Sequence, residues 1–297
     1  MNISCPVCKS SSYHRIGIPQ IGDKASKIIN TRYWVVQCYN CQFYFLEPHI
    51  NFSQDEWEYL YNSEYFPKPT KWHLKQRESD RKKRFDKLQN YSSLNIVNFL
   101  DIGCGEGYSL LEANKRGWES YGIDIFDNRL DETKNKTSQF LKSDLLNASY
   151  PDNFFDIIYL DSVLEHVTNP LEYLIEIKRI LKKRGLIYIG VPNEDSLLNE
   201  IRKYYFRISG KKDISVKIKP FKTPFHVGGY NSSSLDYLIK TVGLEIREKR
   251  NFASRMEFLK YSFLSRDYLT GLILLPLYLI AIPFKREAYF ELYLEKK

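Results

Sequence analysis

A buried strand that runs directly into a glycine-rich turn constrains this chain more than any other feature. Residues 95–101 predict the strand, residues 102–107 (Ile-Gly-Cys-Gly-Glu-Gly) predict the turn, and residues 108–116 predict a helix. In a doubly wound α/β sheet, such a turn lies at the carboxyl end of a parallel strand, where ligands bind. Hydrophobic residues make up 43% of the chain, which is enough for a core and excludes a disordered or fibrous protein.

The residues after this turn continue to alternate between strands and helices. Further strands are predicted over 118–125, 140–143, 155–160 and 186–191, with an amphipathic helix over 171–181. A last strand over 289–294 would be an antiparallel one, inserted late in the sheet. This order predicts an α/β, Rossmann-like, doubly wound and mostly parallel sheet over residues 95–297.

The charges around the turn indicate which nucleoside it binds. Asp101 precedes the glycines and Glu106 lies among them, so a dinucleotide pyrophosphate would be repelled. S-adenosylmethionine (SAM) carries a cationic amino group and no phosphate, which suits these acids. Gly103, Gly105 and Gly107 let the backbone approach a ligand closely. Asp124, at the end of the next strand, can accept hydrogen bonds from ribose hydroxyls, and Asp144 can cap the adenine amino group.

Two pairs of cysteines stand near the start of the chain. Cys5 and Cys8 form one C-x-x-C knuckle, and Cys38 and Cys41 form the other. Two such knuckles supply the tetrahedral four-sulfur shell that zinc prefers, with no open position for catalysis. We therefore expect a structural Zn²⁺ and a small zinc ribbon over residues 1–50. A redox pair is the alternative, but no βαβ pattern surrounds either knuckle.

A helical linker or cap is predicted between the ribbon and the sheet, over residues 51–94. Residues 53–61 begin with Ser53, a favourable N-cap, and predict one helix. Residues 71–89 predict a second helix rich in Lys and Arg, whose charges we expect to face solvent.

Six motifs in order resemble class I SAM-dependent methyltransferases. They are Asp101 to Gly107, Gly122-Ile-Asp124, Asp144-Leu145, Asp156 to His166, Leu181 to Gly185 and Val191-Pro-Asn193. The resemblance implies a seven-stranded sheet and a SAM site that includes Asp101, Gly103, Gly105, Gly107, Asp124, Ile125, Asp144, Leu145 and Asp161. Together with the knuckles and the run Pro224-Phe-His226, it is similar to zinc-ribbon methyltransferases of bacterial glycan and sugar modification. The sugar C-methyltransferases of that group carry a further C-terminal domain that has no counterpart in this sequence.

Methyl transfer to a hydroxyl needs a base near neutral pH, and histidine is the natural choice. His166 follows the fourth strand, beside the expected methyl position, and His226 follows a basic stretch. Either is a candidate base, and either can instead be a structural histidine. Tyr61 and Tyr65 are candidates to cover the sulfonium through cation–π contact, with ordinary packing as the alternative.

The stretch over residues 193–230 carries eight Lys and Arg residues, and the whole chain has a formal net charge of +8. Insertions at strand carboxyl ends usually shape the acceptor site. We expect a lid that grips an anionic small-molecule acceptor such as a sugar, a nucleotide-sugar or a lipid-linked sugar, with a solvated loop as the alternative. The rival function is an RNA methyltransferase that uses the ribbon to bind RNA. Against nucleic acid, the residues after strand four (161–164) lack the Asn/Asp-Pro-Pro-Tyr signature of base amino-group methylation.

The run over residues 269–284 is apolar but interrupted by Pro276 and Pro283, and it is shorter than a membrane span requires. It predicts either a buried helix or a helix in contact with a membrane surface. Residues 1–9 lack the pattern of a secretion signal, so we expect a cytoplasmic location, with contact to the inner face of the membrane as an addition.

Overall fold

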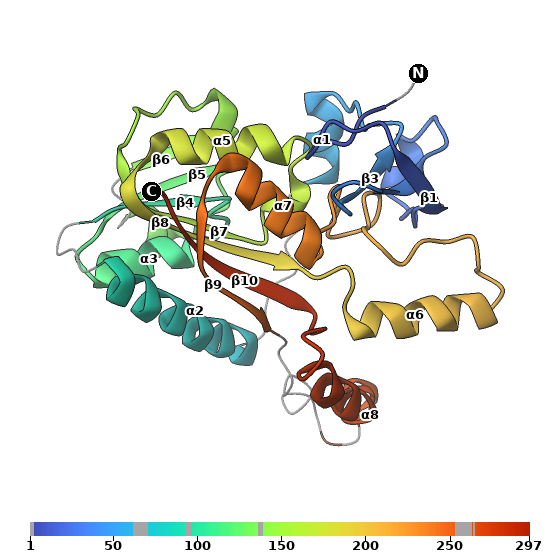
Figure 1. The fold of residues 1–297 in the computed structure, drawn as a ribbon. Coiled ribbons are helices and arrows are strands. Elements are labelled where there is room, and N and C mark those ends of the chain that lie inside the picture. Colours follow the sequence, from blue (N-terminus) through green and yellow to red (C-terminus); the bar gives the residue numbers. More distant parts are fainter. Residues whose placement is uncertain (1–2, 62–70, 93–96, 136–138, 253–262, 264) are drawn as a thin grey trace.

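The strand before the glycine turn and the six strands after it form one seven-stranded sheet in the order β6-β5-β4-β7-β8-β10-β9 (Figure 1). The computed structural model describes residues 3–61, 71–92, 97–135, 139–252, 263 and 265–297. The strands are β4 (Asn98–Ile102), β5 (Glu119–Asp124), β6 (Gln139–Lys142), β7 (Phe155–Asp161), β8 (Leu181–Pro192), β9 (Glu245–Phe252) and β10 (Tyr289–Glu295). Only β10 among them runs antiparallel to its neighbours, which confirms the predicted fold.

Eight helices accompany the strands in the described part of the chain. They are α1 (Gln54–Leu60), α2 (Lys71–Ser92), α3 (Tyr108–Lys115), α4 (Asp131–Lys134), α5 (Pro170–Ile180), α6 (Leu197–Ile208), α7 (Ser232–Val242) and α8 (Arg266–Ala281). Three short 3-10 turns are η1 (Ala25–Lys27), η2 (Leu145–Asn147) and η3 (Leu164–His166). The predicted cap at Ser53 is confirmed: its hydroxyl accepts from the Glu56 amide in a capping box.

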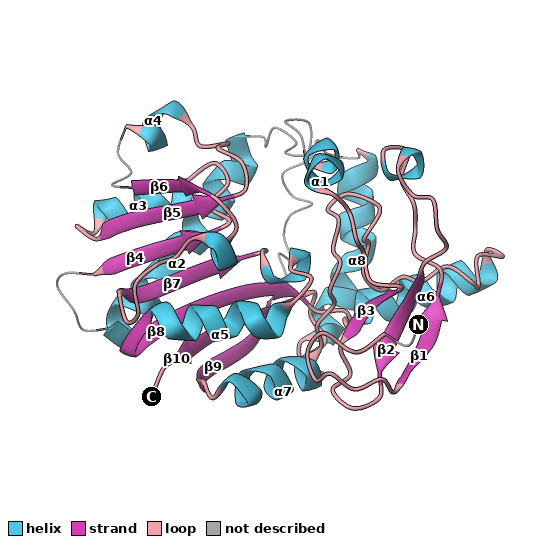
Figure 2. Cartoon of the chain, turned by 90° about the horizontal axis from the view of Figure 1, so that it is seen from above, coloured by secondary structure: helices cyan, strands magenta, loops and turns pink. Residues whose placement is uncertain are grey.

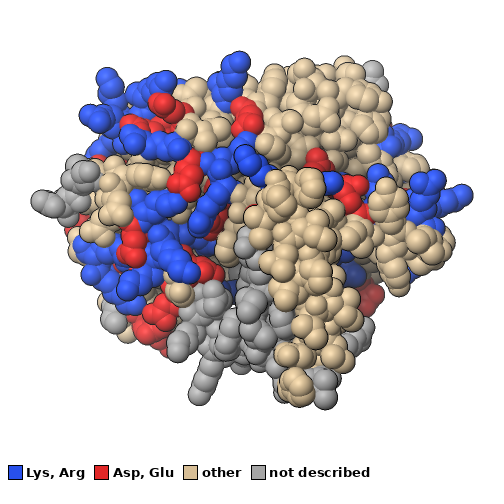
Figure 3. Space-filling view, turned by 60° about the horizontal axis from the view of Figure 1, so that its bottom comes forward, with Lys and Arg blue, Asp and Glu red and all other residues tan. Residues whose placement is uncertain are grey.

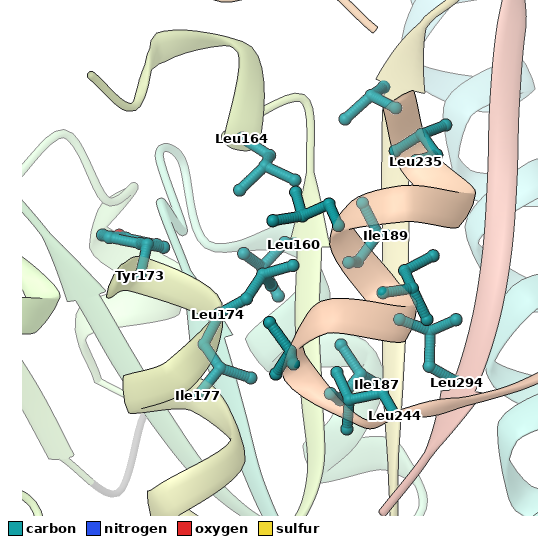
Figure 4. Packing of buried hydrophobic residues seen from close by; sticks show 14 of the residues in the cluster. Leu160, Leu164, Tyr173, Leu174, Ile177, Ile187, Ile189, Leu235, Leu244 and Leu294 are labelled. Carbon is teal, nitrogen blue, oxygen red and sulfur yellow. The ribbon is translucent and has the colours of Figure 1, made fainter. Parts of the chain in front are cut away.

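Alternate residues of the central strands face two different cores. Leu160, Ile187 and Ile189 pack under α5 and α7 (Figure 4). Their neighbours Tyr159 and Tyr188 point to the other face, where α2 and α3 cover them. Because both faces are buried, the middle stretches of β7 and β8 (residues 157–160 and 186–191) consist of apolar residues, tyrosine and glycine, as is typical of parallel strands between helix layers.

A second, three-stranded antiparallel sheet contains β1 (Tyr13–Gly17), β2 (Trp34–Cys38) and β3 (Tyr44–Glu47). Figure 2 shows this sheet on the side toward which the parallel strands point. It packs on residues from the far end of the 193–230 stretch, including Ile218, Phe221 and Phe225. The N-terminal unit thus shares a core with a distant part of the chain and closes one end of the ligand side.

The helix predicted in the apolar C-terminal run is present as α8, but the expectation that it is buried is wrong. Ala281 is the one buried residue among the side chains described in this helix, while Ile273 is 75% exposed. Pro276 lies inside the helix without ending it. No helix in the described ranges is long and apolar enough to cross a membrane.

Candidate functional site

The glycine turn between β4 and α3 has the backbone that its sequence predicts. Gly103, Gly105 and Gly107 all have positive φ, at 68°, 50° and 82°, a region that glycine adopts without strain. A Cβ on Gly103 would lie 2.6 Å from Val163, and one on Gly107 would lie 2.1 Å from Thr133. A Cβ on Gly105 would meet no protein atom within 4 Å. The turn therefore leaves free space above Gly105.

Acidic side chains converge on that space from the ends of three strands. Asp124 accepts hydrogen bonds from the amides of Gly105 and Phe126, at 2.9 and 3.1 Å. Burial, reinforced by the nearby charges of Asp161 and Asp124, raises the pKa of Asp101 well above its usual range. Burial also raises the pKa of Asp124. A bound cation would relieve this accumulation of negative charge, so the acids fit a sulfonium nucleoside with a free amino group.

These groups line a cleft of about 1490 Å³, which is large enough for a nucleoside and an acceptor together. Three apolar residues line this cleft: Ile125, which follows the end of β5, and Leu145 and Leu146 of η2. Leu145 is buried, whereas Ile125 and Leu146 are 44% and 46% exposed and offer apolar surfaces to an adenine ring. Asp144 caps η2 by accepting from the Leu146 amide, at 2.9 Å.

Helix α2 covers one wall of the cleft with arginines, a role that the sequence did not reveal. The Arg84 guanidinium lies 2.6 Å from Asp161 and 2.6 Å from Glu291, and its side chain is only 13% exposed. Arg81 also lines the cleft. The expectation that the charges of this helix face solvent is wrong for Arg84. Asp161, predicted in the cofactor site, lies at the cleft but is neutralised by this arginine.

Both predicted histidines lie in the same cleft, close to each other. The ring centroids of His166 and His226 are 5.1 Å apart, and the Tyr61 hydroxyl is 3.0 Å from Nδ1 of His166. Burial lowers the pKa of His166 to about 4, and burial with the neighbouring His166 lowers that of His226 to about 3. Both rings are therefore neutral at pH 7, so each has a ring nitrogen that can accept a hydrogen bond from a hydroxyl, while the same burial makes each a weaker base than a histidine in water.

Glu165 lies next to the two histidines, and the sequence predicts no role for it. Its carboxylate lies 3.8 Å from Nε2 of His226 and has no hydrogen-bond partner among the described residues. Burial raises the pKa of Glu165 to about 8. Ligand atoms of Glu165, His166 and His226 lie within 4.8 Å of one another, so the three could also hold a divalent cation. The sequence feature that could have indicated Glu165 is its position directly before His166, shortly after the end of a predicted strand.

The four N-terminal cysteines come together as predicted. Sγ of Cys5 lies 3.5 Å from that of Cys41, and Sγ of Cys8 lies 3.4 Å from that of Cys38. Tetrahedral zinc with Zn–S bonds of about 2.3 Å places its sulfurs about 3.8 Å apart. The Cys41 thiol next to Cys5 lowers the pKa of Cys5 to about 6. These residues could hold a metal, and none of them lines the cleft.

Two further expectations have mixed outcomes. Tyr61 reaches the cleft, whereas Tyr65 lies outside the described residues. In the 193–230 stretch, Lys217 is buried and paired with Asp195 and Glu200, so it cannot grip an acceptor. Lys211 and Lys212 are exposed, and their part in a lid stays a prediction.

Known proteins resemble this chain over its central part. Residues 100–189 match the family model described as "Methyltransferase domain". An uncharacterized protein of Methanocaldococcus jannaschii is 35% identical over 41% of this chain, which spans about half (53%) of that relative's length. A ubiquinone biosynthesis O-methyltransferase of Hydrogenovibrio crunogenus is 24% identical over 56% of this chain and 69% of its own. The fold is shared with a SAM-dependent methyltransferase from Archaeoglobus fulgidus (TM-score 0.50, 21% identity, 74% of this chain and 94% of that chain).

The neutrality of His226 predicts how stability depends on pH. A histidine whose pKa falls from about 6.5 to about 3 on folding stabilises the protein above pH 6.5, and this stabilisation is lost as the pH falls. Relative to His226→Gln, the wild-type chain should lose about 1.4 kcal/mol of unfolding free energy per pH unit between pH 6 and pH 4. Urea unfolding at several pH values measures this.

The control is His49→Gln, which changes an exposed histidine of the N-terminal unit and should keep the wild-type slope. Parallel stability curves for wild type and His226→Gln would show that His226 is not held neutral by burial.

Proposed function

We propose that this chain, whose residues 100–189 are a class I SAM-dependent methyltransferase domain, transfers a methyl group from SAM to a hydroxyl of a small acceptor. The observation that supports it most is the pair of neutral histidines in the cleft that also holds the glycine turn. When bound, SAM supplies an activated methyl group, so the protein has to position the acceptor and remove its proton.

The residues at the sheet end fit SAM in its three parts. Gly105 leaves room for the methionine portion, and Gly103 lines the cleft next to it, with Asp101 beside its amino group. Asp124 suits the ribose hydroxyls, and Asp144, with Ile125 and Leu146 near it, suits the adenine. None of these groups would favour a phosphate.

The acceptor end is formed by different residues. His166 or His226 takes the hydroxyl proton on a ring nitrogen, and the Tyr61 hydroxyl holds the ring of His166. The carboxyl group of Glu165 beside His226 can accept a hydrogen bond from the imidazolium that forms. The name of the Hydrogenovibrio relative, an O-methyltransferase, supports oxygen as the methylated atom.

The acceptor class is a narrower part of the proposal. We favour a lipid-linked sugar or another lipid-like acceptor over a free nucleotide-sugar or RNA. The wall of the cleft includes Leu198 of α6 and Tyr278 of α8, and both helices expose apolar side chains. An acceptor with an apolar tail would find contacts there that a free nucleotide-sugar cannot use.

Zinc is proposed as the structural metal of the N-terminal unit. Lys9 and Gln42, each directly after the second cysteine of its knuckle, both have positive φ, at 59° and 63°. The two knuckles thus end in the same turn, as expected for two halves of one four-cysteine site. Bound zinc would hold β2 and the first knuckle together and so fix the sheet that closes the acceptor end.

Replacing Gly105 by alanine should weaken SAM binding by about tenfold or more, since its Cβ would enter the free space above the turn. Gly117→Ala is the matched control: Gly117 also has positive φ, at 73°, and its Cβ would also meet no protein atom within 4 Å. Both variants carry a similar backbone cost, but only Gly105 lines the cleft. Calorimetry with SAM measures the difference; equal affinities for the two variants would remove the turn from the cofactor site.

The base is tested with His166→Gln, His226→Gln and the double variant. Labelled methyl transfer from SAM is measured to a polyprenyl-phosphate-linked sugar, a nucleotide-sugar, a phenolic quinone precursor and an RNA oligonucleotide. Loss of the base should lower kcat by about 10²–10⁴-fold with SAM affinity retained. His49→Gln should behave as wild type. A double variant with wild-type turnover would exclude both histidines, and transfer to RNA alone would favour the rival function.

Metal removal should lower thermal stability by several degrees, because a small sheet depends on its metal for part of its folding energy. Elemental analysis should find one zinc per chain in the wild type and none in Cys8→Ser. Cys104→Ser, which changes the buried cysteine of the glycine turn, should keep the zinc. Purified wild-type protein without bound metal, and with a melting temperature that chelator leaves unchanged, would contradict the zinc assignment.

A further inference from the structure

Helix α8 lies on the outside of the molecule with apolar side chains toward solvent. Leu272, Ile273 and Ile280 are 47%, 75% and 53% exposed, and Phe284 just beyond the helix is 68% exposed. In Figure 3 a continuous strip without charged side chains runs over this helix. An apolar helix without a covering layer is costly in water and marks a contact surface.

Helix α6 extends this apolar surface. Ile201, Tyr204 and Ile208 recur at helical spacing on one side, exposed by 44%, 63% and 86%, and no residue of the helix is buried. The first residue of α6 is bonded to the segment that follows α8: the Leu197 amide donates to the Arg286 carbonyl, at 2.9 Å. Figure 1 shows both helices outside the layers that cover the central sheet. We call the exposed side chains of α6, α8 and residues 282–284 the α6–α8 surface.

Basic residues accompany the α6–α8 surface. Lys203 and Arg207 are exposed on the opposite side of α6 from Ile201, and Lys211, Lys212 and Lys285 are exposed at the ends of the two helices. Asp213 is an exposed acid next to Lys211 and Lys212. A surface with apolar residues in its middle and lysines at its ends complements the boundary between acyl chains and anionic headgroups.

We infer that the α6–α8 surface docks on an anionic phospholipid bilayer, with α6 and α8 lying in the headgroup region. No described helix is long and apolar enough to span the bilayer, so the contact is peripheral. A second copy of the chain is a poorer occupant. In a two-fold pair the surface would face itself, and the basic residues around it would face their own equivalents.

The cleft opens beside this surface. Leu198 and Tyr278, which line it, belong to the two helices that contact lipid. If the proposed function holds, an acceptor anchored in the bilayer can reach His166 and His226 without leaving the membrane. Docking itself depends only on the exposed residues and not on the chemistry in the cleft.

The test is co-sedimentation of the full chain with vesicles of phosphatidylcholine alone or mixed with phosphatidylglycerol. The wild type should partition onto the mixed vesicles and dissociate as the salt concentration rises. The double variants Ile273→Glu/Phe284→Glu and Lys211→Glu/Lys212→Glu should each reduce partition by about tenfold or more. The controls are Ile175→Glu, an exposed isoleucine of α5, and Lys183→Glu/Arg184→Glu, an exposed basic pair at the start of β8.

Calorimetry with SAM on the same variants is the control for folding, since their SAM affinity should not change. It also keeps the two proposals apart, because SAM binding is measured without vesicles. The inference is overturned if the wild type stays in the supernatant with both kinds of vesicle. It is also overturned if the surface variants partition like the controls. Light scattering that shows a dimer split by Ile273→Glu, with no vesicle binding, would instead assign the surface to a second copy.

Discussion

The carbonyl oxygen of Glu165 accepts hydrogen bonds from two successive amides, those of Val227 and Gly228, at 2.9 and 3.0 Å. One residue further, Gly229 exchanges both backbone hydrogen bonds with Tyr44 of β3. These few bonds join the end of β7, the end of the 193–230 stretch and the N-terminal sheet. Because they fix the backbone on both sides of the histidine pair, the distances among Glu165, His166 and His226 depend on them.

Burial then determines the charge of that group. In water a glutamate is ionised and two histidines are partly protonated at neutral pH. In this cleft the solvation that would support either charge is lost, so the carboxyl group keeps its proton and the rings stay neutral. The acids on the cofactor side, Asp101 and Asp124, are likewise held at a cost that a cation would offset. At both ends of the cleft, burial therefore favours the uncharged form of the titratable side chains.

Most of the cofactor side could be predicted from the sequence, because its residues are local to strand ends and a turn. Gly103, Gly105 and Asp124 lie within one strand–turn–helix–strand unit, and hydrophobic periodicity alone places them together. The grouping of the four cysteines could be predicted equally well, since the spacing within the two knuckles indicates that their sulfurs can meet at one point. The role of Arg84 could not be predicted, because the sequence of a highly charged helix does not show which of its faces packs on a sheet.

The sequence left two alternatives open for α8, a buried helix and a helix at a membrane surface, and could not decide between burial and exposure. An apolar run of this length is typical of a core helix. Whether it is buried depends on which other elements pack against it, and the run itself does not show that. The closeness of His166 and His226 could be proposed but not established, since 59 residues lie between them in the chain and only the joined backbones bring them together.

The family match ends at residue 189, and this boundary has a consequence for what the match says about the acceptor. Trp57, Tyr61, Pro224 and His226, which line the acceptor end of the cleft, all lie outside the matched stretch. The matched stretch also contributes Glu165 and His166 to the same cleft, so the acceptor end of the proposed site combines residues from inside and outside it. Similarity over residues 100–189 alone therefore does not identify the acceptor, because part of the wall that would contact it comes from the two flanks.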